Sequence, residues 1–207
     1  KSFIEKIAGI DFEVTILVPQ GANPTTYSLL PSQMVEIANA TLWFRMGYVG
    51  FELSTADRIT SIRPELKVVD LSEGLEIISK KSLTRPDVVT GHDPHTWLSP
   101  VNVKTMAGRI LEELIQLNPG KKEDYTAGYQ QFLTEINAVD DTIRNLLMDH
   151  QGKPFITFHP SLSYFARDYG LVQYSMEEGG KEPSPAHLAR LAEIAGANGI
   201  RTVYIQS

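Results

Sequence analysis

One long helical pattern limits the fold more than any other feature of this chain. Between positions 121 and 150, hydrophobic residues recur at spacings of three and four, at Tyr125, Tyr129, Phe132, Ile136, Val139, Ile143 and Leu147. No proline interrupts this run, and Gln151-Gly152 ends it. At 1.5 Å per residue the helix is about 45 Å long, longer than a small lobe is wide. We therefore predict a helix that runs along two lobes and joins them; an arm of a helix bundle or a coiled-coil segment would show the same pattern.

Strand-like and helix-like segments alternate on both sides of this run. Strands are predicted at 12–18, 42–46, 67–71, 153–158, 170–174 and 202–207, and helices at 3–8, 31–38, 101–117, 162–169 and 185–194. Ser184 is the expected N-cap of the last helix, with Pro185 at its first position. Such alternation indicates βαβ units and a mostly parallel sheet, which binds ligands at the carboxyl ends of its strands.

The predicted fold class is therefore α/β, with two lobes of mostly parallel sheets flanked by helices and joined by one long rigid helix. The expected boundaries are an N-terminal lobe over 1–119, a linking helix over 120–151 and a C-terminal lobe over 152–207. The chain opens on a bare amphipathic helix and closes on a strand. We expect from this that it is truncated at both ends, with an incomplete C-terminal lobe.

Composition and charge narrow the range of partners. Hydrophobic residues make up 42% of the 207 residues, which is enough for a packed core. The net charge is −6 and no long basic run is present, which argues against nucleic acid or an anionic membrane surface as the partner. The chain has no cysteine, so disulfides and thiolate metal sites are excluded. No hydrophobic run approaches the roughly 20 residues of a membrane span. The given residues show no signal-peptide pattern, which does not exclude one that was removed from the mature chain.

Two histidines share one local context. His95 and His159 each follow a predicted extended segment and sit beside a proline, one in each half of the chain. Pro94 restricts its own φ and makes Asp93 extended, so the turn can hold an imidazole still. Neutral imidazole nitrogen is a good ligand for zinc and similar divalent ions. A surface turn, or a histidine hydrogen-bonded in the core, is the simpler interpretation of either residue alone.

The other histidines carry less weight. We expect His92 to face solvent, His150 to place a favourable charge at the end of the long helix, and His187 to lie on the surface in a first helical turn.

The sequence contains no recognisable catalytic motif. Motifs for a serine-hydrolase elbow, a Walker loop, a dinucleotide fold and His-Glu-x-x-His are absent. Ser161 and Ser163 lie near His159 but show no arrangement of base and acid partners. Asp93 and Glu182 are candidate carboxylates that no pattern places together.

Several motifs resemble the metal-binding proteins of zinc and manganese ABC importers, the ZnuA-like cluster A-I solute receptors. The most specific is Asp93-Pro94-His95-Thr96-Trp97-Leu98-Ser99-Pro100, which is similar to the family's Asp-Pro-His-x-Trp-Leu-x-Pro. The other similar stretches are 21–27, 158–165 with 169–171, and Glu182-Pro183-Ser184-Pro185. The resemblance covers essentially the whole chain, and implies two α/β lobes, one rigid helix and a metal ion bound between the lobes.

Carried over position by position, the resemblance makes His95 and His159 metal ligands. Thr25 stands where the family has its first histidine, and the family's last acidic ligand would lie beyond Ser207. The histidine-rich loop of many zinc receptors is also missing from 80–92. Half of the usual site would then remain, completed by water or a nearby oxygen.

The implied function is capture of a metal ion rather than turnover. A histidine at the third ligand position favours zinc over manganese, because nitrogen ligands suit zinc and oxygen ligands suit manganese. The expected partners are the ion and an ABC permease, for a monomeric, lipid-anchored or free protein of the periplasm or cell envelope. A stiff linking helix implies small lobe motions, so release should depend on loops near His95 or His159. A metal-free or weak-binding adhesin or interaction protein of the same fold and, less favoured, a metal-dependent hydrolase are the alternatives.

Overall fold

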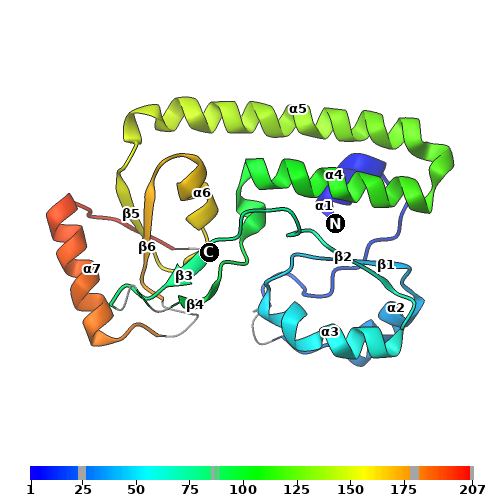
Figure 1. The fold of residues 1–207 in the computed structure, drawn as a ribbon, viewed down its shortest axis with the longest axis horizontal. Helices are drawn as coiled ribbons and strands as arrows, with labels where there is room; N and C mark the ends of the chain where they lie inside the picture. The colour runs from blue at the N-terminus through cyan, green and yellow to red at the C-terminus, as the bar shows by residue number, and fades with distance from the viewer. Residues whose placement is uncertain (23–26, 85–86, 88, 178–181, 206–207) are drawn as a thin grey trace. The chain divides into compact units, whose positions relative to one another are not determined.

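The computed structural model describes residues 1–22, 27–84, 87, 89–177 and 182–205 (Figure 1). Its helices are α1 (Ser2–Ala8), α2 (Pro31–Asn39), α3 (Gly50–Ile62), α4 (Pro100–Leu117), α5 (Lys122–Leu147), α6 (Ser163–Asp168) and α7 (Pro185–Asn198). Its strands are β1 (Leu42–Arg45), β2 (Lys67–Asp70), β3 (Ser79–Lys81), β4 (Val89–His92), β5 (Pro154–Thr157), β6 (Val172–Ser175) and β7 (Val203–Tyr204). Short 3-10 turns cover Thr96–Leu98, Pro119–Lys121 and Met148–His150.

The chain divides into two compact units. Unit 1 comprises residues 1–75 and 104–135, and unit 2 comprises residues 76–103 and 136–207. Two of the three divisions fall inside α4 and α5, so each of these helices contributes to both units. The expected boundaries at 119/120 and 151/152 stay a prediction.

Unit 1 contains a parallel pair of strands with helices packed around a hydrophobic core. β1 pairs with β2 in the register Leu42↔Lys67 to Arg45↔Asp70. The buried core beside this pair consists of Leu29, Ile37, Phe51, Ile59 and Leu66. These residues come from α2, α3 and the segments that flank them, so the helices cover the strands by burying their apolar faces.

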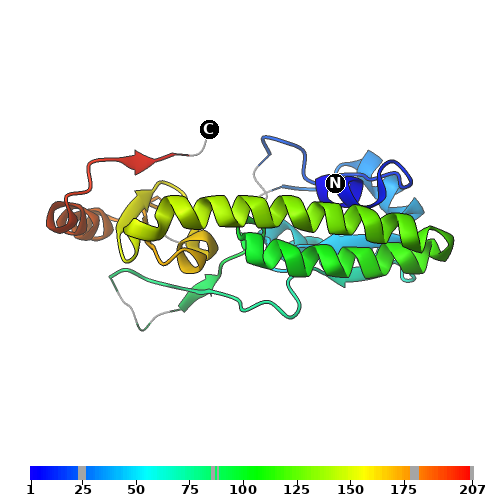
Figure 2. The ribbon, with the colours of Figure 1, turned by 90° about the horizontal axis from the view of Figure 1, so that it is seen from above.

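In a second part of unit 1, α1 packs against α5. The Phe3 and Phe132 rings lie 5.4 Å apart, and Lys6 Nζ donates to Glu135 Oε2 at 2.6 Å. Gly128 lies where α1 approaches closest, since a Cβ at this position would overlap the Ile7 carbonyl. Figures 1 and 2 both show α4 and α5 running alongside each other in this unit.

Unit 2 contains a three-stranded parallel sheet and a separate hairpin. The strand order is β6-β5-β7, with β5 in the middle and Pro154↔Val172 and Ile156↔Val203 in register. β3 and β4 form an antiparallel pair, with Ser79 opposite His92. All three sheet strands therefore end at the same edge, just before His159 on β5.

Most of the predicted elements are confirmed, and one strand is wrong. The long helix is present as α5 with a 3-10 turn at each end, and Ser184 caps α7 with Pro185 at its start. Residues 12–18, predicted as a strand, form no strand. Leu17 is partly buried against the core as its hydrophobicity suggests, but its carbonyl accepts from Gln33 Nε2 at 2.6 Å rather than from a strand. The antiparallel β3–β4 pair and α3 were not predicted.

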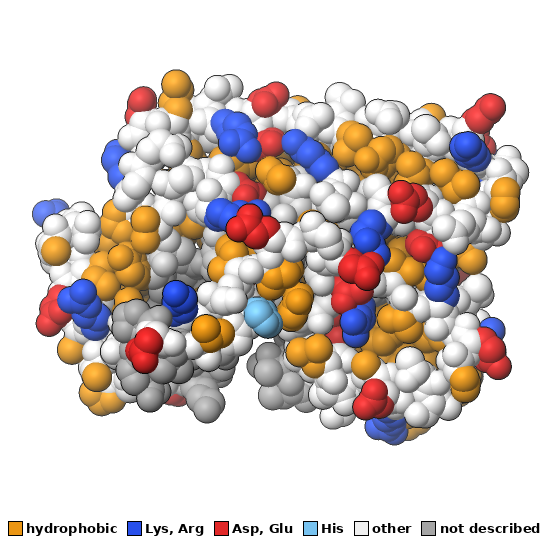
Figure 3. All heavy atoms as spheres, viewed as in Figure 1, with side chains coloured by type: hydrophobic (Ala, Val, Ile, Leu, Met, Phe, Trp, Pro, Cys, Tyr) orange, Lys and Arg blue, Asp and Glu red, His pale blue; other side chains and the backbone are white. Residues whose placement is uncertain are grey.

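Charged side chains do not gather into a single field on the face drawn in Figure 3, where acidic and basic groups lie next to one another. In unit 1, for example, Arg45 pairs with Asp70 at 2.8 Å, and Arg109 pairs with Glu73. Among the described residues, no helix has both the length and the hydropathy that crossing a bilayer requires.

Candidate metal centre

The turn that carries His95 is built from short polar side chains that bind its backbone. The Asn102 amide N–H donates to Ser99 Oγ at 3.1 Å, which caps the start of α4, and Asn102 Nδ2 donates to the Thr96 carbonyl at 3.1 Å. Thr96 and Ser99 are fully buried. Because these bonds satisfy backbone groups that the turn leaves open, the chain between β4 and α4 has one defined path.

Asp93 fixes the ring of His95. Its Oδ1 lies 2.6 Å from His95 Nδ1 and accepts the His95 backbone N–H at 3.0 Å. The Asp93 side chain is 0% exposed and that of His95 is 13% exposed. Burial alone would raise the pKa of Asp93, but hydrogen bonds from His95 and Ser163 and the charge of Lys80 outweigh it and hold this pKa below its usual value. Asp93 is therefore an anion that accepts a hydrogen bond from the imidazole N–H.

His159 has a carboxylate partner of its own. It lies two residues beyond β5, and its Nδ1 is 2.5 Å from Glu177 Oε2. Glu177 lies two residues beyond β6, and its backbone N–H donates to the Phe158 carbonyl at 3.0 Å. Parallel strands that end together thus bring Glu177 to His159.

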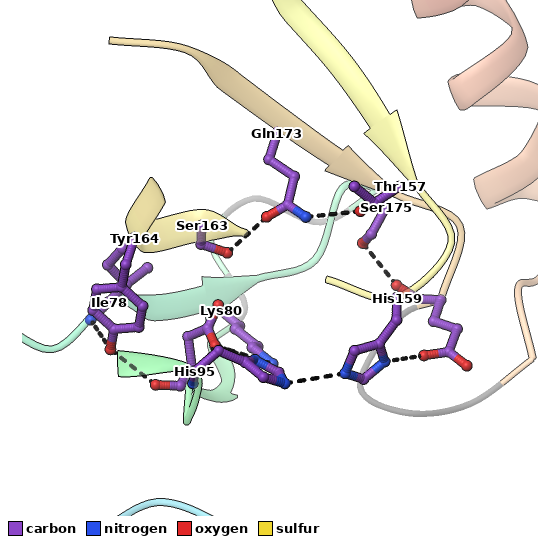
Figure 4. A network of polar contacts seen from close by, with 11 residues as sticks. Ile78, Lys80, His95, Thr157, His159, Ser163, Tyr164, Gln173 and Ser175 are labelled. Carbon is purple, nitrogen blue, oxygen red and sulfur yellow. Dashed lines mark hydrogen bonds and ion pairs between the residues drawn. The ribbon is translucent and has the colours of Figure 1, made fainter. Parts of the chain in front are cut away.

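The two imidazoles meet through their other nitrogens. His95 Nε2 and His159 Nε2 are 3.2 Å apart, and the rings are nearly perpendicular, at 83° with centroids 5.0 Å apart (Figure 4). A carboxylate only accepts hydrogen bonds, so each Nδ1 carries the proton and each Nε2 keeps its lone pair. Two nitrogens bound to one tetrahedral zinc at 2.0–2.1 Å would lie about 3.3 Å apart. The two lone pairs are therefore spaced for a single metal ion.

Among the residues that the structure describes, no group of three or more His, Cys, Asp or Glu side chains is arranged to hold a metal ion. The set brought together here is a pair of nitrogen ligands. Thr25, which stands at the family's first-histidine position, lies outside the described residues.

The other three histidines differ in exposure and in how they compare with the predictions. His92 is exposed as expected. His150 is exposed in the turn that follows α5, and its expected role as a favourable charge at the helix end stays a prediction. His187, predicted on the surface, is only 3% exposed, and this prediction is wrong. Its Nε2 lies 2.8 Å from the Ser175 carbonyl, because the first turn of α7 packs against the end of β6.

The candidate serine and carboxylate side chains form no catalytic arrangement among the described residues. Ser163 Oγ donates to Gln173 Oε1 at 3.1 Å. Asp93 is paired with His95, while Glu182 is exposed. The supporting role of Asp93 could have been read from the Asp-Pro-His spacing. Glu177 had no local signal, since only the register of β5 and β6 brings it to His159.

Comparison with known proteins identifies the family. A family profile described as ZnuA, zinc-uptake complex component A, periplasmic, matches residues 1–207. The chain belongs to this family. A "Putative metal-binding protein" of Chlamydia muridarum is 30% identical to it over 206 residues, covering 99% of this chain and 72% of that protein.

Characterised members of the ZnuA family show the same likeness. The high-affinity zinc uptake system protein ZnuA of Bacillus subtilis is 25% identical over 213 residues, covering 99% of this chain and 67% of that protein. A crystal structure of a ZnuA deletion mutant with zinc bound is 33% identical, with a TM-score of 0.88 over 98% of this chain and 76% of that chain. These ZnuA relatives are metal-binding transport receptors rather than enzymes. This chain shares their α/β fold.

Proposed function

We propose that this chain is the extracytoplasmic solute-binding receptor of a metal importer. It would capture a divalent transition-metal ion, preferably zinc, and deliver it to a membrane permease. The observation that carries this proposal is the approach of His95 Nε2 to His159 Nε2 at 3.2 Å with a carboxylate behind each ring. Membership of a family described as periplasmic and active in zinc uptake supports both the compartment and the ion.

The chemistry of the pair favours capture of zinc over manganese. Both converging atoms are imidazole nitrogens, which suit zinc, whereas manganese prefers carboxylate and carbonyl oxygen. Asp93 and Glu177 hold each ring in the tautomer that leaves Nε2 free to bind, and raise its basicity. Two protein ligands leave further coordination positions, which water or another oxygen can fill. That the ion lies between two lobes stays a prediction.

Titration of the purified chain with zinc and with manganese tests the proposal. We expect one zinc ion per chain, tighter binding of zinc than of manganese, and loss of binding in both His95→Ala and His159→Ala. His150→Ala is the matched control, because His150 is exposed and lies outside the pair. Bound zinc at 100 times its Kd should stabilise the fold by about 2.7 kcal/mol.

Other outcomes would point to other functions. Unchanged zinc affinity in His95→Ala would contradict the proposed site. A metal content near zero after mild purification, with no zinc binding on titration, would favour a metal-free interaction protein. Turnover of ester or phosphate substrates that a chelator abolishes would favour a hydrolase.

A further inference from the structure

The support behind His95 extends well beyond its carboxylate. The Asp93 backbone N–H donates to the Ile78 carbonyl at 2.9 Å, which continues the β3–β4 pairing. The Asp93 carbonyl accepts from the Tyr164 hydroxyl at 2.8 Å, and the same hydroxyl accepts from the Ile78 N–H at 3.2 Å (Figure 4). Asp93 and Tyr164 are both 0% exposed. The main chain on which His95 sits is therefore held by a hairpin and by α6 at once.

The ring of His159 is supported by one side-chain contact, to Glu177, at a more open place. The His159 side chain is 36% exposed and that of Glu177 is 23% exposed. The main chain of Glu177 is held, since its N–H donates to the Phe158 carbonyl at 3.0 Å and its carbonyl accepts from Ser175 Oγ at 2.9 Å, so the freedom lies in its side chain. Glu177 also lines a cavity of about 520 Å³ in unit 2, whereas Asp93 does not. The Glu177 side chain thus borders open space, whereas the Asp93 side chain is fully buried.

Cationic groups stand on the wall of that cavity. Lys80 and Arg167 line it together with Glu177. Both already have acidic partners, because Lys80 Nζ lies 4.0 Å from Asp93 Oδ1 and Arg167 Nη2 donates to Asp168 Oδ1 at 2.8 Å. Asp93 Oδ1 thus has a cation beside it as well as the ring and the backbone N–H of His95, so Asp93 is held from more sides than Glu177.

We propose that the two imidazoles play unequal parts: His95 is the fixed ligand, and His159, held by Glu177 alone, is the ligand that leaves the metal first. Glu177 is then a positioning residue whose contact sets the release rate of the ion. This inference rests on the proposed function, since it assigns an order of release to the same pair.

Release kinetics of the full chain test this order. Zinc-loaded protein is mixed with excess chelator and the release rate is followed, with thermal unfolding measured in parallel. Glu177→Gln should release zinc about tenfold faster with an unchanged Tm, in the range usual for residues that orient metal ligands. Tyr164→Phe should lower the Tm but change the release rate less than twofold. Glu193→Ala, at an exposed carboxylate on α7, is the control. Equal acceleration in Glu177→Gln and Tyr164→Phe, or none in Glu177→Gln, would overturn the order.

A measurement without metal separates this inference from the proposed function. In nitrogen-15 spectra of the histidine rings of the metal-free protein, His95 should give one sharp tautomer with Nδ1 protonated. His159 should show exchange broadening that Glu177→Gln increases. Equally sharp signals from both rings would refute the inequality even if zinc binds. Unequal rings in a protein that fails to bind zinc would refute the proposed function and, with it, the release order.

Discussion

Glu52 is a buried carboxylate in unit 1 that makes stability depend on pH. Its oxygens accept the Met46 and Gly47 backbone N–H groups at 2.8 Å each. Burial raises the pKa of Glu52 above its ordinary value of 4.5 and outweighs these hydrogen bonds, which lower it. A carboxyl group whose pKa is raised by folding gives stability that is present below the unfolded-state pKa and lost as pH rises through the folded-state pKa.

The stability of Glu52→Gln relative to the wild type is therefore expected to increase as pH rises. The amide cannot ionise, so the free energy of unfolding of the wild type should fall relative to that of the variant between about pH 4 and pH 7. Urea unfolding at both pH values measures the difference. A difference that does not change with pH would mean that Glu52 has the same pKa in the folded and unfolded chains.

Thr25 offers a second test at the scale of one residue. The family resemblance puts a histidine at this position, and threonine is a poor zinc ligand. Thr25→His should lower the Kd for zinc, while Thr25→Ala should leave it nearly unchanged; calorimetric titration measures both. A Kd for Thr25→His equal to that of the wild type would argue against any contribution of this position to the site.

Residues with a motif around them could be predicted, and residues brought in by packing could not. The proline-flanked contexts of His95 and His159 led to the expectation that the two rings converge on one ion, and the rings do approach each other. His187 was misassigned because the sequence does not show that its helix turn packs on β6. Glu177 was missed because a strand register, and no local pattern, sets its neighbour.

At the scale of elements, the close approach of α1 to α5 depends on Gly128. A methyl group here would overlap the Ile7 carbonyl, so Gly128→Ala should destabilise the protein by about 1–3 kcal/mol. Gly196→Ala on α7 is the matched control, because nothing lies within 4 Å of its added Cβ. This control should stabilise the protein by about 0.4–1 kcal/mol, since alanine favours the helix. Chemical denaturation compares them, and a stabilising Gly128→Ala would contradict the close packing.

The end of α5 is attached to α6 by a buried hydroxyl. Tyr169 donates to Asp140 Oδ1 at 3.0 Å, and Arg144 pairs with the same carboxylate at 3.0 Å. Burial and then Asp140 raise the pKa of Tyr169, so the hydroxyl keeps its proton. Tyr169→Phe should cost about 1–3 kcal/mol of stability, which thermal unfolding measures. An unchanged Tm would show that this contact adds nothing to the attachment.

Elements with a strong period could be predicted, and those that depend on a neighbour could not. The periodicity of α4 and α5 and the capping of α7 are local properties, and these helices lie where expected. The alternation in 12–18 would bury Phe12, Val14 and Ile16 together, but Ile16 is 55% exposed, and Leu17 and Val18 pack against the core instead. It could not indicate pairing, because a strand also requires a partner, and among the described residues β1 and β2 pair only with each other.

At the scale of the molecule, zinc should act locally. Both proposed ligands and both carboxylates belong to unit 2. We expect zinc to slow amide hydrogen exchange mainly in 93–99 and 157–177, and His95→Ala to remove this protection. Equal protection of β1 and β2 would contradict a response confined to the proposed ligands and their supports.

Neither unit is a continuous stretch of chain, and this affects how the protein can form during synthesis. Residues 1–75 leave the ribosome long before residues 104–135, which complete unit 1. At about 5–20 residues per second, the delay lasts several seconds. Helix α1, whose Phe3 ring packs against Phe132 of α5, must wait that long for its partner, with this apolar surface uncovered. The nascent chain therefore passes through an interval in which a chaperone can bind, and that interval ends with the emergence of α5.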